Sequence, residues 1–207
     1  MKTKICVVTS SRADYGLLRF LIHKIDMSSF FNLQLVVSGS HLSKIHGFTL
    51  SEIIKDNITI SKKIESISET NTRMDIANNV SNTIQRMTKA FSSLKPDMVL
   101  LLGDRYEIFS TAIASAFLNI PIAHIHGGEL TEGAIDDVLR HSITKLAHIH
   151  FTSTMIYKKR VIQMGEQPKS VFNVGSLGVD NLNKLKLIDI ETLQKHLDFK
   201  FKSKNIM

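Results

Sequence analysis

Ten acidic, basic and imidazole side chains lie within about forty residues in the middle of this 207-residue chain. Their types are those that proteins use to transfer protons and to bind anions. Two segments that carry them, residues 98–107 and 122–129, are apolar runs that end at glycine and continue with charged residues. In an open parallel sheet, such strand ends gather where ligands bind. The pattern predicts a reaction centre. Its candidate residues are Asp104, Arg105, Glu107, His124, His126, Glu129, Asp136, Asp137, Arg140 and His141.

Asp104 follows Gly103 at the end of the first apolar run, where a carboxylate is well placed for acid–base chemistry. The alternative is a structural role, because aspartate often caps a helix and one is predicted to begin near Arg105.

Asp136 and Asp137 fall in the first turn of a second predicted helix, where the helix dipole favours an ionised carboxylate. Arg140 and His141 follow about one helical turn later, close enough to orient those carboxylates. The alternative is a helix cap with an ion pair inside the helix. Because Asp104 and Asp136 follow adjacent strand ends, we expect two carboxylates to converge on one cleft, an arrangement suited to proton transfer.

His124 and His126 are two residues apart in a predicted strand, so their side chains are expected on the same face. Such a pair is found among the metal ligands of amidohydrolase barrels, but those sites need ligands from later strands. Here only His148 and His150 offer a second pair. A core histidine packed against the sheet is the simpler interpretation, and we expect no metal and no cofactor.

Residues 10–16 join the first predicted strand to the first helix, which is the phosphate-binding position of doubly wound folds. The segment lacks the glycines of a dinucleotide-binding turn and the lysine of a P-loop. Functionally, Arg12 would pair with a phosphate while Ser10 or Ser11 donates hydrogen bonds. The alternative is a helix cap by Ser11 or Asp14 beside a surface arginine.

The elements that position these residues alternate between strand and helix, which predicts a doubly wound α/β domain with a Rossmann-like parallel sheet. The predicted strands cover residues 4–9, 33–37, 58–64, 98–102, 122–126, 148–152 and 171–174. The predicted helices cover residues 15–25, 74–94, 106–118, 136–146 and 155–164, with a short helix within 41–54. We expect one domain over residues 1–178. Residues 179–207 are expected to be a linker helix and the start of a truncated second domain, with 199–207 approaching another strand.

Composition narrows the class of protein. No stretch approaches eighteen apolar residues, so no membrane span is predicted, and the single Cys6 suits a cytoplasmic protein. The net charge of +7 would suit nucleic acid, but aromatics are only 7% and no basic stripe contains them. We expect an anionic small substrate, such as a nucleotide diphosphate, instead.

Several short motifs occur in order and together resemble the hydrolysing UDP-N-acetylglucosamine 2-epimerases of sialic-acid synthesis. The similarity extends over nearly all 207 residues. The motifs are Arg12-Ala-Asp-Tyr15, Gly39-Ser-His-Leu42, Gly103-Asp-Arg105, His124-Ile-His-Gly-Gly-Glu129, Ile135-Asp-Asp137, Arg140-His141, Thr144-Lys-Leu-Ala-His148 and Val174-Gly-Ser176.

The resemblance implies the N-terminal half of a two-domain, glycosyltransferase B-type architecture with the site between the domains. Such enzymes remove the C2 proton of the sugar, eliminate UDP and add water, releasing N-acetylmannosamine. By the same resemblance, Arg12 contacts the UDP phosphates, Asp104 and Asp136 take part in proton transfer, and Arg140 and His141 organise the site.

Two departures from the family pattern bear on the activity. Some branches have a catalytic glutamate where this chain has His126, so His126 or Glu129 is expected to take that role. Family members also continue through a second domain, which implies that this chain alone has little activity. The full-length form is expected to be a homo-oligomer.

Three alternatives remain at this point. The substrate could be a UDP-linked 2,4-diacetamido trideoxyhexose of the legionaminic-acid route. The chain could be a non-catalytic binding domain. It could also be a metal-dependent hydrolase that uses His124 and His126.

Overall fold

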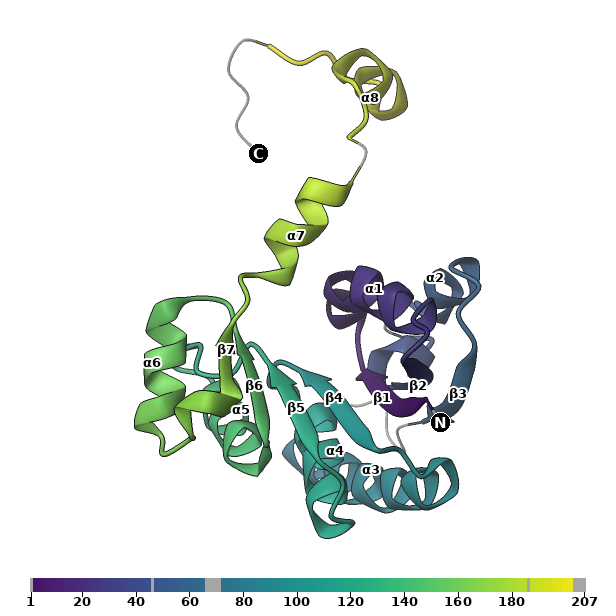
Figure 1. The fold of residues 1–207 in the computed structure, drawn as a ribbon. Coiled ribbons are helices and arrows are strands. Elements are labelled where there is room, and N and C mark those ends of the chain that lie inside the picture. Colours follow the sequence, from purple (N-terminus) through teal and green to yellow (C-terminus); the bar gives the residue numbers. More distant parts are fainter. Residues whose placement is uncertain (1, 46, 66–71, 186, 203–207) are drawn as a thin grey trace.

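The computed structural model describes residues 2–45, 47–65, 72–185 and 187–202. Parallel strands in the order β3-β2-β1-β4-β5-β6-β7 form one sheet in this part of the chain (Figure 1). The strands are β1 Thr3–Thr9, β2 Phe31–Ser38, β3 Ile60–Ile64, β4 Met98–Leu102, β5 Ile122–Ile125, β6 Ile149–Thr152 and β7 Val171–Asn173. The α-helices are α1 Arg12–Asp26, α2 Leu50–Lys55, α3 Arg73–Leu94, α4 Tyr106–Phe117, α5 Ile135–Leu146, α6 Met155–Gln163, α7 Leu177–Lys184 and α8 Ile190–Leu197. Two 3₁₀ turns, η1 Gly39–Leu42 and η2 Pro168–Ser170, complete the elements.

Helices cover both faces of the sheet, which confirms the predicted doubly wound α/β fold. Alternate residues of β1 belong to two different apolar cores because successive strand side chains point to opposite faces. Ile5 and Val7 pack in the core beneath α1 and α2, whereas Cys6 and Val8 pack in the core beneath α3, α4 and α5. A strand buried on both faces explains the uninterrupted apolar run of residues 5–8.

The strand order reverses at β1, which pairs with β2 on one side and with β4 on the other. Crossovers leave β1 and β4 toward opposite faces at this point, because α1 packs on one apolar core and α4 on the other, and in such folds ligands bind where the strand order reverses. The loops that begin with Ser10 and Gly103 follow these two strands. The fold therefore places both predicted loops at the edge of the sheet where ligands bind.

Two element boundaries differ from the sequence prediction in ways that matter for the site. Helix α1 begins at Arg12 because the Ser11 hydroxyl accepts the backbone N–H of Asp14 and caps the helix. Strand β5 ends at Ile125, and His126 has a left-handed backbone with φ of 65°. The alternation that placed His124 and His126 on one face therefore does not extend to His126.

The C-terminal segment leaves the sheet after β7 and returns along α1. The side-chain amide of Asn181 in α7 donates to the carbonyl oxygens of Gly16 and Leu17, at 2.7 and 3.3 Å. Helix α8 lies farther from the sheet (Figure 1). Residues 199–202 form no strand, and the remainder of the predicted strand, 203–207, lies outside the described residues. The domain boundary at residue 178 stays a prediction.

None of the described helices is long and apolar enough to cross a membrane. The cytoplasmic location stays a prediction.

Candidate functional site

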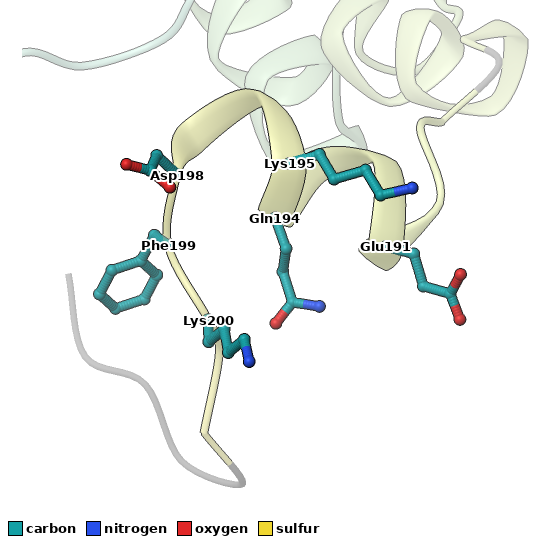
Figure 2. Close-up of a pocket in the computed structure, with 6 residues that line it drawn as sticks. All are labelled: Glu191, Gln194, Lys195, Asp198, Phe199 and Lys200. Atoms are coloured by element: carbon teal, nitrogen blue, oxygen red, sulfur yellow. The ribbon is translucent and has the colours of Figure 1, made fainter.

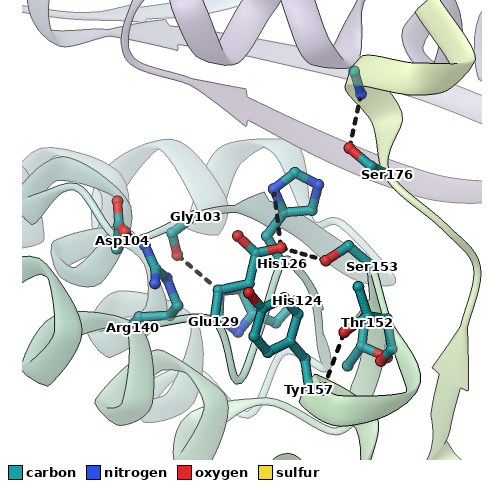
Figure 3. A network of polar contacts seen from close by, with 12 residues as sticks. Gly103, Asp104, His124, His126, Glu129, Arg140, Thr152, Ser153, Tyr157 and Ser176 are labelled. Carbon is teal, nitrogen blue, oxygen red and sulfur yellow. Dashed lines mark hydrogen bonds and ion pairs between the residues drawn. The ribbon is translucent and has the colours of Figure 1, made fainter. Parts of the chain in front are cut away.

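The best-connected polar group at the carboxyl edge of the sheet is an ion pair between Asp104 and Arg140. Asp104 follows β4, and the Nη2 of Arg140, from α5, contacts its Oδ2 (Figure 3). The same Nη2 donates to the Thr131 hydroxyl at 3.0 Å, and Nη1 lies 4.0 Å from the Asp137 carboxylate. Asp137 also accepts the backbone N–H of Thr131 at 3.1 Å. These contacts join the loop before α5 to the end of β4.

Arg140 has hydrogen-bonding capacity left over. Its side chain is only 8% exposed, yet Nε and Nη1 find no hydrogen-bond partner among the described residues. Burial lowers the pKa of Arg140 from its usual value, but an arginine remains cationic at neutral pH. Buried donors are normally satisfied, so the Nε–H and Nη1–H₂ groups, of which Nη1 lies near Asp137, leave Arg140 with hydrogen-bonding capacity that its described neighbours do not use.

A second polar cluster follows β5 and β6. The Ser153 hydroxyl donates to Oε1 of Glu129 at 2.6 Å, and Nδ1 of His126 lies 3.8 Å from the same oxygen (Figure 3). Burial lowers the pKa of His126, and the nearby Glu129 carboxylate opposes that shift. His126 is therefore uncharged near neutral pH, and its buried Nε2 has no partner in the described structure. A neutral imidazole beside a carboxylate can accept a proton.

Gly128 allows the loop between His126 and Glu129 to pack against α6. Its φ is 78°, and a Cβ added there would lie 2.7 Å from the Tyr157 carbonyl oxygen and 2.8 Å from Val161 Cγ2. Arg160 donates to the Gly128 carbonyl from the same helix. No larger residue fits this position without moving the loop, so helix α6 determines where His126 and Glu129 lie.

His124 is a core histidine that supports the site from beneath. It is fully buried, and its Nε2 donates to the Gly103 carbonyl at 2.8 Å, while Nδ1 lies 3.2 Å from the Thr144 hydroxyl. Burial lowers its pKa to about 4, so the ring is neutral. Because both ring nitrogens are engaged, His124 is not available as a metal ligand. The simpler interpretation of this histidine fits the structure, and the metal-dependent alternative loses one of its two ligands.

The turn after β1 is held together by its own side chains. The Ser10 hydroxyl donates to Asp14 Oδ2 at 2.6 Å, and the Ser40 hydroxyl donates to the Ser10 carbonyl at 3.0 Å. The Arg12 side chain is 75% exposed, and its Nε lies 3.2 Å from Glu52 Oε1. Ser11 has the capping role that the sequence offered as an alternative.

The comparison with known proteins decides the family. A family model described as UDP-N-acetylglucosamine 2-epimerase matches residues 23–207. The chain belongs to this family.

Relatives in the family differ in the sugar that their names give. A GDP/UDP-N,N'-diacetylbacillosamine 2-epimerase (hydrolyzing) of Campylobacter jejuni is 43% identical, covering 96% of this chain and 52% of the relative. The polysialic acid biosynthesis protein P7 of Escherichia coli is 44% identical, covering 92% and 49%. A UDP-N-acetylglucosamine 2-epimerase of Neisseria meningitidis is 31% identical, covering 100% and 53%. The chain spans about half the length of these relatives.

Solved structures of the family share the fold. The UDP-N-acetylglucosamine 2-epimerase of Neisseria meningitidis bound to UDP-N-acetylglucosamine superposes with a TM-score of 0.80 at 20% identity, covering 95% of this chain and 52% of that one. The Methanocaldococcus jannaschii enzyme in complex with UDP-N-acetylglucosamine and UDP gives a TM-score of 0.76 at 18% identity, covering 88% and 49%. At such identities the likeness concerns the fold.

Arg105 and Glu107, at the start of α4, lie beside the η1 turn that follows β2. Arg105 contacts the buried Glu107 carboxylate through Nε at 3.2 Å and Nη2 at 3.1 Å. Gly39, with φ of 58°, lets η1 approach, because a Cβ there would lie 2.7 Å from Glu107 Oε1. Helix α4 begins at Tyr106 with Arg105 as its cap residue, so the alternative capping role of Asp104 is wrong.

Some of the site residues predicted from the sequence lie in the two clusters described above, and others lie apart from them. Asp136 lies half-buried in the first turn of α5, one residue before the Asp137 that faces Arg140. His141 instead lines a pocket of about 690 Å³ with Phe109 and Ile113 between α4 and α5. The roles of Asp136 and His141 toward a substrate stay predictions.

Two members of the clusters were missed from the sequence. Ser153 holds Glu129, and Thr131 holds Arg140. Ser153 directly follows the predicted strand at 148–152, and the rule that loops after parallel strands meet at one edge could have found it. No sequence signal singles out Thr131.

A further pocket of about 400 Å³ lies at the end of α8 (Figure 2). Residues of α8 and the segment after it line this pocket, which lies away from the loops of the sheet. The lining residues are Glu191, Gln194, Lys195, Asp198, Phe199 and Lys200.

Proposed function

We propose that this chain is the N-terminal half of a hydrolysing UDP-sugar 2-epimerase. The observation that carries the proposal is the ion pair of Asp104 and Arg140 close to the cluster of His126, Glu129 and Ser153, all at the carboxyl edge of the sheet. Together they offer acid–base groups beside a guanidinium whose Nε and Nη1 have no hydrogen-bond partner among the described residues. Membership of the family supports the same activity.

In the proposed reaction, a base takes the proton from C2 of the sugar and the bond between C1 and the UDP oxygen breaks, giving a C1–C2 double bond. Water then adds across that bond. Its hydroxyl bonds to C1, and a proton bonds to C2 on the face opposite to the one from which the first proton was removed, which inverts C2. With UDP-N-acetylglucosamine the products are N-acetylmannosamine and UDP. Each step needs proton transfer, and the departure of UDP needs stabilisation of negative charge.

The side chains divide these tasks by their charge. We assign proton transfer at C2 to neutral His126, with Glu129 orienting the imidazole and Ser153 orienting Glu129. Asp104 and Asp136 are assigned to the second proton transfer and to the water. Arg140 positions Asp104 and is assigned to the developing negative charge, whereas Arg12 and Ser10 are assigned to the diphosphate.

Two sugars are candidates for the substrate of this reaction. We take UDP-N-acetylglucosamine as the first candidate substrate. The second is a UDP-linked 2,4-diacetamido trideoxyhexose, and the relatives at 43% and 40% identity that are named diacetylbacillosamine 2-epimerases support it.

A second domain is part of the proposal. Helices α7 and α8 and the segment between them carry apolar side chains that are more than half exposed, as expected of a surface that another domain covers. They include Val179, Leu182, Leu187, Ile188, Ile190 and Leu197. Without that domain the site is open to water, which weakens electrostatic stabilisation of a transition state. We therefore expect the 207-residue chain to fold and to bind UDP weakly. We expect it to show little epimerase activity, so that by itself it behaves as a binding domain.

The test is to incubate each UDP-sugar in D₂O with a version of the protein extended to the length of its relatives. Released UDP and a free 2-epimerised sugar carrying deuterium at C2 are the expected products. The sugar with the higher kcat/KM identifies the substrate. Failure of the extended protein to release UDP from either sugar would remove the proposed activity. Sustained turnover by the 207-residue chain alone would remove the need for a second domain.

A further inference from the structure

Helices α1 and α2 are joined by two arginine–carboxylate pairs. Arg12 and Arg19, seven residues apart, lie two turns apart on α1, whereas Glu52 and Asp56 lie one turn apart at α2. Arg12 pairs with Glu52 at the end of α1 nearest the sheet edge, and Arg19 pairs with Asp56 farther along. The two pairs differ in how firmly they are built.

The pair at Asp56 is rigid. The Asp56 side chain is 6% exposed, and Arg19 contacts both of its oxygens, with Nε 2.6 Å from Oδ2 and Nη2 2.5 Å from Oδ1. The Tyr15 hydroxyl donates to Oδ2 at 2.6 Å. A carboxylate that accepts three hydrogen bonds, two of them from one guanidinium, has a defined position. The end of α2 is thereby held against α1, which keeps Glu52 opposite Arg12.

The pair at Glu52 is loose. Arg12 is 75% exposed, Glu52 is 44% exposed, and their contact is a single Nε to Oε1 approach of 3.2 Å. Exposed pairs of this kind contribute little free energy. Glu52 also borders a pocket of about 410 Å³ between the helices, so its side chain has room to turn away from Arg12. This contact can be exchanged for a better anion.

We propose that Glu52 is the resting partner of Arg12 and competes with a phosphate of the nucleotide for that guanidinium. The inference rests on the proposed function, in which Arg12 contacts the diphosphate. A diphosphate offers several charged oxygens to the planar guanidinium and outcompetes one carboxylate, whereas a weak monoanion does not. Glu52 thereby lowers the affinity for every anion and restricts Arg12 to strongly charged ligands. Asp56 and Arg19 serve to keep this competitor in place.

The test measures UDP binding by titration calorimetry on the 207-residue chain and on four variants. Glu52→Gln keeps the size of the side chain and removes its charge, so it is expected to tighten UDP binding. The expected gain is roughly two- to five-fold, which corresponds to an exposed ion pair of up to about 1 kcal/mol. Arg12→Ala is expected to weaken binding. In the double variant Arg12→Ala/Glu52→Gln, the gain is expected to disappear.

A charge-matched control separates competition from a general change in field. Asp26→Asn removes one negative charge at the exposed far end of α1 and is expected to leave UDP affinity unchanged. The gain from Glu52→Gln is also expected to shrink in about 1 M salt, where the screening length is about 3 Å.

The outcomes separate this inference from the proposed function. If Arg12→Ala weakens UDP binding but Glu52→Gln does not strengthen it, competition is rejected while the role of Arg12 stands. A gain that persists in the double variant also rejects competition. If Arg12→Ala binds UDP as well as the unaltered chain, or if no form binds UDP, the phosphate role of Arg12 and the competition are both rejected.

Discussion

Arg140 of helix α5 contacts the carboxylate of Asp104 at the end of strand β4, although the two residues are 36 positions apart. This ion pair joins the two segments that the sequence singles out for acid–base chemistry. Arg140 also connects the polar loop before α5 to this pair, because it donates to Thr131 in that loop and approaches Asp137 in the first turn of its own helix.

Replacing Arg140 by lysine is expected to destabilise the fold. A lysine amine is a compact point charge and cannot reach Asp104, Thr131 and Asp137 together. Leaving a mostly buried carboxylate with one weaker partner is expected to cost about 1–3 kcal/mol of unfolding free energy. Urea denaturation followed by circular dichroism measures this cost. The control, Arg86→Lys on the exposed face of α3, is expected to change stability by less than about 0.5 kcal/mol. Equal losses in both variants would contradict a special role of Arg140.

Asp104→Asn and Asp136→Asn are each expected to reduce turnover of the extended protein by about 10²–10⁴-fold, the usual effect of losing a positioned acid or base. Steady-state release of UDP from the UDP-sugar measures the loss. Asp26→Asn serves as the control and is expected to keep normal turnover. Near-normal UDP release by either site variant would remove that carboxylate from the mechanism.

Gly128→Ala is expected to destabilise the protein more than Gly133→Ala. Both glycines have φ near 80°, so both alanines have the strain of a left-handed backbone, about 1–2 kcal/mol. Only at position 128 would the new Cβ also collide with the Tyr157 carbonyl and Val161, whereas position 133 has open space. The difference between the two midpoints of thermal unfolding isolates the collision. Equal midpoints would mean that the loop after β5 moves away from α6 without cost.

Acid is expected to destabilise the fold through His124 before the carboxylates titrate. Burial lowers the pKa of His124 from 6.5 to about 4, so the unfolded chain binds more protons between these values. The stability from this neutral ring is fully present above pH 6.5 and is lost as the pH falls through the folded pKa of about 4. It amounts to up to roughly 3 kcal/mol. Unfolding free energies between pH 7 and 4 are expected to fall less steeply for His124→Gln. An unchanged slope would contradict the neutral, buried ring.

The order and type of the main elements were predictable from the sequence because each rests on local pattern. Residues 5–8 form an uninterrupted apolar run, as a strand buried on both faces requires, and β4 has the predicted bounds 98–102. Helix α3 follows from apolar residues recurring every three or four positions. Strand ends at glycine, followed by charged residues, located the candidate site at the edge of the sheet. The family motifs were also visible, since they depend on residue identity and order alone.

The tertiary structure decided which of the polar side chains meet. Sequence spacing suggested that Arg140 orients the carboxylates of its own helix, but the packing of α5 beside β4 directs it mainly to Asp104. Spacing also suggested that His124 and His126 share a face, but the positive φ of His126 separates their surroundings. Glu129 meets Ser153, and Arg12 meets Glu52, only because different crossovers return to the same edge. Local pattern determines an element because its causes lie within a few residues, whereas a contact between loops depends on how every intervening element packs.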